Sequence, residues 1–123
     1  MAHQHIDTQR NPIDESEFRK ECRSRLEADG ALVLNDFFTS DAIEQVIEES
    51  SECEGDAYYA DATHNVYLTP PDPTLPSDHA FNRQVISSKG LIADDQIPDN
   101  SPLRSVYEDA AFRSFLCAVL DIN

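Results

Sequence analysis

The sequence lacks the features that place a chain in a membrane or outside the cell. No apolar run approaches the ~20 residues that a membrane-spanning helix needs. The polar N-terminus has no apolar segment of the kind found in secretory signal peptides. We therefore expect a soluble, cytoplasmic protein.

Cysteine pairing motifs are also absent. The three cysteines are an odd number without C-x-x-C spacing, which argues against a disulfide framework and against a zinc knuckle. Cys53 stands among acidic residues, which disfavour a thiolate, and Cys22 shares a predicted helical face with Phe18 and Leu26. We expect reduced thiols that do not act as nucleophiles.

Basic residues are scarce. The chain has 24 acidic residues against nine Lys and Arg, for a net charge of −15, and no Lys or Arg occurs between Gly30 and Asn82. Such a surface repels nucleic acid and anionic membranes, so neither is an expected partner. Two interpretations of the acidic span remain: a solvated face that aids solubility, or a docking surface for a basic partner.

Common catalytic motifs are missing as well. The chain contains no G-x-S-x-G, P-loop, G-x-G-x-x-G or H-E-x-x-H sequence. The stretch His5-Ile6-Asp7 has the H-x-D pattern that supplies two ligands of a non-haem Fe(II) site. Such ligands normally lie on a rigid barrel strand, whereas residues 1–12 are polar and without periodicity. We therefore expect a flexible N-terminal arm here instead of an iron site.

The histidines further along the chain do not suggest a metal site either. His64 and His79 lack a carboxylate or thiol at ligand spacing on a shared face. A zinc or iron site that used both would depend on a spatial approach that the sequence does not show. Judged by its own residues, the chain contains no catalytic constellation and no metal site.

Two helices are predicted in the first half of the chain. The first carries Phe18, Cys22 and Leu26 at i, i+4 and i+8, with Asp14 as N-cap and Gly30 just past its end. The second follows an N-cap at Thr39 or Ser40, and its inward residues are predicted to be Ala42, Ile43, Val46 and Ile47. The run ALVL between the two helices is predicted to be a short buried strand.

The middle of the chain changes character after Gly55. Residues 57–68 are aromatic and β-branched enough for one or two strands, and the prolines of residues 69–77 predict an irregular loop. Residues 78–90 predict a short helix and residues 91–100 a strand and turn. The inward residues expected of that short helix are Phe81, Val85 and Ile86.

The C-terminal part predicts two further helices. Ser101 followed by Pro102 is a typical helix start, and Asp109 can cap the next helix. That last helix has the strongest apolar stripe in the sequence, which we expect to form an interface: Phe112, Phe115, Leu116, Val119 and Leu120.

The order of these elements carries a resemblance. The segment LEADGALVLNDFFTSDAIEQVIEE, with G-x-x-x-x-x-x-F spacing from Gly30 to Phe37, resembles the N-terminal segment of Fe(II)- and 2-oxoglutarate-dependent oxygenases of the phytanoyl-CoA dioxygenase-like superfamily. HNVYL, TLPSDHAFNRQVISSKGLIADDQIP and SPLRSVYEDAAFRSFLCAVL are similar to the region that follows in a branch of these enzymes. The similarity extends from about Phe18 to Leu120, and its motifs are patterns of apolar and turn residues.

The resemblance implies an α+β fold, the front segment of a double-stranded β-helix (jelly-roll) oxygenase. Residues 13–123 would be a partial N-terminal domain behind the arm of residues 1–12. In the complete family, Fe(II) held by two His and one carboxylate binds 2-oxoglutarate and O2, and a C–H bond of a small molecule is hydroxylated or halogenated. The iron ligands and the Arg that pairs with 2-oxoglutarate lie in the catalytic barrel, so this chain alone is expected to bind neither cofactor and to be inactive.

The resemblance also implies partners and a substrate-facing region. Asn65, Tyr67 and Arg83 are the residues expected to reach the substrate pocket of a complete enzyme. An ordinary strand face and a solvated Arg explain the same residues equally well. The expected partner is a C-terminal catalytic half or a second copy of the chain. The alternative is a small acidic module that binds a basic partner. If the chain is an enzyme fragment, it should expose apolar surface where the barrel would pack. If it is a finished module, its apolar residues should be closed within a core.

Overall fold

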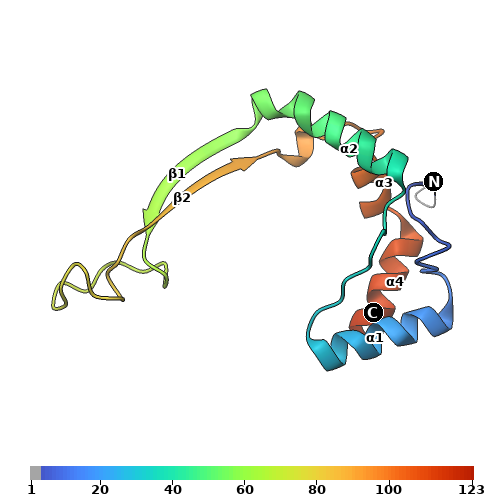
Figure 1. The fold of residues 1–123 in the computed structure, drawn as a ribbon, viewed down its shortest axis with the longest axis horizontal. Helices are drawn as coiled ribbons and strands as arrows, with labels where there is room; N and C mark the ends of the chain where they lie inside the picture. The colour runs from blue at the N-terminus through green and yellow to red at the C-terminus, as the bar shows by residue number, and fades with distance from the viewer. Residues whose placement is uncertain (1–3) are drawn as a thin grey trace.

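The computed structural model describes residues 4–123, in which a two-stranded ribbon projects from a body of helices (Figure 1). Two short 3-10 helices, η2 (Glu54–Asp56) and η3 (Asp94–Gln96), flank the base of the ribbon. The fold class is α+β, as the sequence predicted. The other elements are α1 (Ser16–Asp29), α2 (Ser40–Cys53), β1 (Tyr58–His64), β2 (Val85–Leu91), α3 (Pro102–Tyr107) and α4 (Ala110–Leu120).

The hydrophobic core lies where α1 packs against α4. Cys22 of α1 is fully buried, as its helical face predicted, and Phe18 stacks on Phe115 of α4 with ring centroids 6.1 Å apart. Burying a side chain of this size contributes roughly 1.5–3 kcal/mol. The other buried members of the core are Ile6, Ile13, Val106 and Val119.

The segment before α1 is packed, which differs from the loose arm expected over residues 1–12. Ile6 is 2% exposed and forms an isolated antiparallel bridge with Phe38. The Asp7 N–H donates a hydrogen bond to the Phe37 carbonyl at 2.8 Å. The buried Ile6, the buried Asn11 and these backbone hydrogen bonds together hold the segment, and composition alone does not reveal such contacts. The first three residues of the expected arm lie outside the described residues.

The predicted helix ends are largely confirmed. The side chains of Thr39, Ser101 and Asp109 each accept a hydrogen bond from a backbone N–H in the first turn of α2, α3 and α4. Gly30 ends α1 with φ 71°, the left-handed conformation that glycine adopts without strain.

Two local predictions around α1 are wrong. Glu15, not Asp14, occupies the N-cap position, and no side chain caps the helix there. Residues 31–34 form no strand, because nothing in residues 4–123 pairs with them in a ladder. Their side chains still alternate, with the two leucines packed against the core and Val33 exposed.

Helix α2 is less buried than its pattern predicted. Ala42 is buried and Val46 is half-buried, but Ile43 and Ile47 are 44% and 60% exposed, so their predicted inward placement is wrong. Glu49 takes an inner position instead, because its carboxylate accepts a hydrogen bond at 2.6 Å from the hydroxyl that caps α3. The inner face of α2 therefore combines the buried Ala42 with polar contacts made by Gln45, Glu49 and Cys53.

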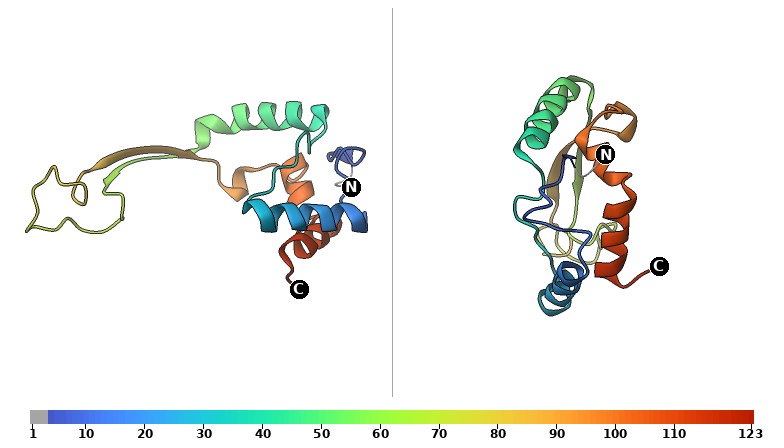
Figure 2. Two further views of the ribbon diagram at one scale, coloured as in Figure 1. Left: turned by 60° about the horizontal axis from the view of Figure 1, so that its bottom comes forward. Right: turned by 90° about the vertical axis from the view of Figure 1, so that its right-hand side faces the viewer.

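The two strands form an antiparallel ribbon. Tyr58 pairs with Leu91 at the base, and His64 pairs with Val85 at the far end. The ribbon leaves the helices beside α2 and carries the loop of residues 65–84 away from α1 and α4, as the left-hand view of Figure 2 shows. The loop is thus held well outside the helical body.

The segment of residues 78–90 does not form the predicted short helix. Its first half turns, and its second half enters β2. Val85 and Ile86 are β-branched, and pairing with β1 places them in a conformation that such residues favour. Residues 69–77 are irregular, as their prolines predicted.

Candidate functional site

The loop at the tip of the ribbon is held by two buried asparagines. The Asn82 amide accepts a hydrogen bond from the Asp72 N–H at 2.7 Å and donates to the carbonyl oxygens of Asp72, Leu75 and Pro76 at 2.8, 3.1 and 3.1 Å. Asn65 accepts from the backbone N–H of Thr69 at 3.0 Å. A buried amide that satisfies several backbone groups fixes a segment that has no ladder of its own. The tip loop is therefore an ordered element.

The three residues expected at a substrate pocket do not share a cavity here. Asn65 is buried, and its amide is already bonded to Thr69 within the loop. Tyr67 is exposed and stacks on Phe81 with ring centroids 5.2 Å apart, while Arg83 is exposed. None of the three lines the cavities described below. Asn65 thus has a structural task in this loop, and the sequence carried no sign of it beyond the abundance of turn residues.

The H-x-D stretch near the N-terminus does not have the geometry of an iron site. The His5 ring lies 3.1 Å from the Gln4 amide, and the Asp7 carboxylate accepts hydrogen bonds from the backbone N–H groups of Gln9 and Arg10. The carboxylate therefore caps a local turn.

The other described histidines are engaged locally too. The His64 ring is 2.8 Å from the carbonyl oxygen of the next residue, and the His79 ring accepts from the Phe81 N–H at 3.1 Å. Within residues 4–123, no three His, Cys, Asp or Glu side chains come close enough to hold a metal ion. The described residues accordingly do not fit the Fe(II) that the resemblance implies for the complete enzyme.

An apolar groove opens between α1, α4 and the chain that joins α1 to α2. Its volume is about 400 Å³. All five residues of the predicted interface stripe of α4 line the groove, but they differ in exposure. Phe115 and Val119 belong to the core, Phe112 is half-buried, and Leu116 and Leu120 are exposed. The groove is lined by Leu26, Leu32, Leu34, Phe37, Phe112, Phe115, Leu116, Val119 and Leu120.

The ribbon exposes large apolar side chains on both of its faces. Residues opposite each other in an antiparallel pair share a face, so Tyr58, Leu91 and Val85 lie on one face, and Tyr59 and Ile86 lie on the other. Tyr58 and Leu91 are 63% and 61% exposed, and Ile86 is 81% exposed. The sheet has two strands, so each strand also has one edge unpaired within the described chain.

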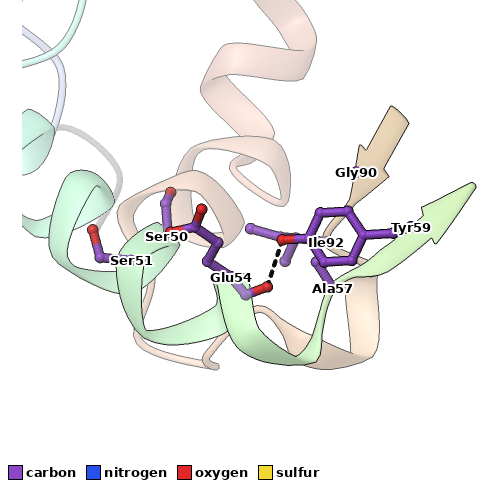
Figure 3. Close-up of a pocket in the computed structure, with 7 residues that line it drawn as sticks. All are labelled: Ser50, Ser51, Glu54, Ala57, Tyr59, Gly90 and Ile92. Carbon is purple, nitrogen blue, oxygen red and sulfur yellow. Dashed lines mark hydrogen bonds between the residues drawn. The ribbon is translucent and has the colours of Figure 1, made fainter. Parts of the chain in front are cut away.

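A second cavity, of about 310 Å³, lies where the ribbon joins α2 (Figure 3). The Tyr59 hydroxyl donates a hydrogen bond to the Glu54 carbonyl at 2.7 Å and so fixes the ring against the end of α2. Ser50 and Ser51 of α2 and Gly90 of β2 complete the walls with Ala57 and Ile92. No sequence pattern indicates this cavity, because it depends on how the ribbon leaves the helix.

No protein-family model, curated protein or solved structure matches this chain. The oxygenase resemblance therefore stays a prediction. In the part of the chain that the structure describes, none of the helices has both the length and the apolar character that crossing a bilayer requires.

Proposed function

We propose that this chain is the non-catalytic front part of an Fe(II)- and 2-oxoglutarate-dependent oxygenase and that it packs against a catalytic β-barrel. The chain would provide surfaces on which the barrel packs. The ribbon and the groove of α1 and α4 would support the barrel, which binds iron, 2-oxoglutarate and a small-molecule substrate. The hydroxylation or halogenation would be carried out by residues outside this chain.

The exposed ribbon is the observation that carries the proposal. Isolated two-stranded sheets are at best marginally stable in water, and large apolar patches on a surface normally mark a contact with another element. Tyr58 and Leu91 stand side by side on one face at the base, where a packed neighbour would cover both. A third strand from the barrel, paired to a free edge of β1 or β2, would stabilise the ribbon beyond its base, where the helices do not contact it.

The groove on the helical body supports the same proposal. Leu116 and Leu120 expose apolar surface beside a core that is otherwise closed by Phe115 and Val119. A finished acidic module would be expected to bury such residues. The groove is thus a second surface on which a catalytic domain can pack.

The test is to express this chain alone and together with the product of the reading frame that follows the codon for Asn123. If the proposal holds, that frame encodes an H-x-D/E motif and a distal His. The isolated chain should show no saturable binding of Fe(II) or 2-oxoglutarate in titration calorimetry. The two parts together should form a 1:1 complex and produce succinate from 2-oxoglutarate when Fe(II) is present.

Surface variants connect this test to the ribbon. Tyr58→Ser with Leu91→Ser should weaken the complex, because both side chains would be covered by the barrel, while circular dichroism shows the helices intact. Tyr107→Ser is the matched control, since Tyr107 is also highly exposed but lies on α3. A saturable micromolar Fe(II) site in the isolated chain, or a downstream frame without the iron ligands, contradicts the proposal.

A further inference from the structure

The outer face of α2 carries an apolar line that no other described element covers. Ile43 and Ile47 are one helical turn apart and exposed, and the next positions on this line are Ser50 and Ser51. The hydroxyls of both serines donate hydrogen bonds to carbonyl oxygens within α2, at 2.7 and 3.0 Å, so neither hydroxyl proton needs an acceptor outside the helix. The line therefore begins with two exposed isoleucines and ends with two serines whose hydroxyls are bonded within α2.

This line continues into the cavity at the base of the ribbon. Ser50 and Ser51 are shared by both, and Tyr59 forms the far wall (Figure 3). From Ile43 to the last turn of α2 the line measures about 15 Å, at a rise of 1.5 Å per residue. A straight surface of this length, ending in a pocket, matches one side of a helix of three turns with an anchoring side chain.

Carboxylates without partners border the line. Glu44 and Glu48 lie beside Ile43 and Ile47 on α2, and neither has a hydrogen bond or ion pair within residues 4–123. Two carboxylates of α1 differ, because Glu17 bonds Lys20 and Glu27 bonds Arg23. No Lys or Arg occurs between Gly30 and Asn82, so the charged side chains of α2 itself are all negative.

We propose that the outer face of α2 and the cavity beside Tyr59 bind a basic amphipathic helix of another protein. The apolar side chains of that helix would lie along Ile43 and Ile47, with one large residue in the cavity. Its Lys or Arg residues would pair with Glu44 and Glu48. The charge selects this occupant, because a second copy of the chain would bring the same carboxylates against each other, and an anionic membrane would be repelled.

Model peptides of about 15 residues, the length at which an isolated helix begins to be stable, test the proposal with the full chain. The probe is a Leu/Lys peptide with leucines at helical spacing. One control replaces every Lys with Glu, and another keeps the composition but scrambles the order so that no apolar stripe forms. Fluorescence anisotropy should show saturable 1:1 binding of the probe, weaker at high salt, and neither control should bind comparably.

Variants locate the binding site. Ile47→Ser should weaken binding of the probe about tenfold or more, as expected for an apolar contact at the centre of an interface. Glu44→Gln with Glu48→Gln should weaken it and flatten its salt dependence. Glu21→Gln with Asp29→Asn removes the same charge from α1 and should have little effect. Leu116→Ser in the α1 and α4 groove should leave binding unchanged.

Several outcomes would overturn this proposal without touching the proposed function. They are equal binding of the scrambled peptide, an unchanged affinity in Ile47→Ser, an equal loss in the α1 charge variant, or no binding of the probe at all. Circular dichroism of each variant, compared with the native chain, verifies that the helices are formed. The oxygenase proposal is tested separately by the catalytic partner and by Tyr58 and Leu91.

Discussion

The aromatic ring of Tyr59 covers Gly90 across the ribbon, so closely that a Cβ atom on Gly90 would lie 2.8 Å from the ring carbon Cε1. The two residues are paired in the ladder, and the Tyr59 hydroxyl is bonded to the Glu54 carbonyl at 2.7 Å. The glycine therefore makes room for a ring that ties the ribbon to the end of α2.

Substituting Gly90→Ala should loosen this attachment. The added methyl group displaces the ring and breaks its hydrogen bond, at a cost of about 1 kcal/mol. In a Tyr59→Ala background the same substitution should instead stabilise the strand by roughly 0.5–1 kcal/mol, because alanine loses less backbone entropy than glycine. Hydrogen exchange of the ribbon amides in the four proteins measures this coupling.

The matched control is Gly55→Ala, where a Cβ atom has no neighbour within 4 Å. Its effect should be the same with and without Tyr59. If Gly90→Ala changed the stability of the ribbon by the same amount in the native protein and in Tyr59→Ala, the close approach of the ring would make no energetic contribution.

Substituting Asn82→Asp should open the tip loop. The Asn82 Nδ2 group donates to three carbonyl oxygens, and a carboxylate in its place would face those oxygens without a donor. We expect a local cost of about 1–3 kcal/mol, seen as faster hydrogen exchange at Asp72 and Leu75 with the helices unchanged. Asn100→Asp, at an exposed position, is the control. Equal exchange in both variants would contradict the role given to Asn82.

The Cys22 thiol should make stability depend on pH in the alkaline range. Burial raises the pKa of Cys22 above its ordinary value of 9.0, with Arg25 opposing and Glu21 adding to the shift. Below that value the thiol is protonated in both states and contributes no slope. Above it, the unfolded thiol loses its proton first, so the free energy of unfolding falls as pH rises.

Urea denaturation from pH 7 to pH 10 checks this expectation. Cys22→Ala should be less stable at pH 7 by about 1 kcal/mol, from the lost packing, but should lose less stability than the native chain as the pH rises. Cys117→Ala keeps the buried thiol and should retain the native slope. Parallel curves for native chain and Cys22→Ala would show that the thiol does not contribute.

The stripe of α4 should separate into core and surface positions. Phe115 is 1% exposed, so Phe115→Ala should cost about 3–5 kcal/mol and leave the chain largely unfolded at room temperature. Leu120 is 52% exposed, and Leu120→Ser should change the free energy of unfolding by no more than about 0.5 kcal/mol. Thermal unfolding compares the two, and a large loss from Leu120→Ser would place that residue in the core.

The sequence predicted what local chemistry decides. Asp109 and Ser101 cap helices because their side chains reach backbone N–H groups a few residues away. The stripe of α4 was recognisable because its 3.6-residue period needs no knowledge of the partner. For Ile43 the same period led to a wrong prediction of burial. Periodicity shows which residues share a helical face, but it does not show whether another element covers that face. The inward side of α2 includes Glu49 instead, through a hydrogen bond with Ser101, which is distant in sequence.

The candidate surfaces were harder to predict because they arise between segments. The cavity beside Tyr59 requires the ribbon to leave α2 at one angle, and the burial of Ile6 requires the chain to return to Phe38. Residues 31–34 show the opposite case: their apolar pattern predicted a strand, but no described segment pairs with them in a sheet. Pairing of distant segments was the information that the linear pattern did not contain.

The ribbon has the mechanics of a lever arm. It is anchored at its base, where Tyr59 bonds Glu54 and Gln96 bonds the Asp56 carbonyl. Seven residues per strand give a reach of about 23 Å at 3.3 Å per residue. A rotation of about 10° at the anchor would carry the tip loop through about 4 Å over that reach. A small change in the packing of η2 and η3 would thus be amplified at the far end of the ribbon.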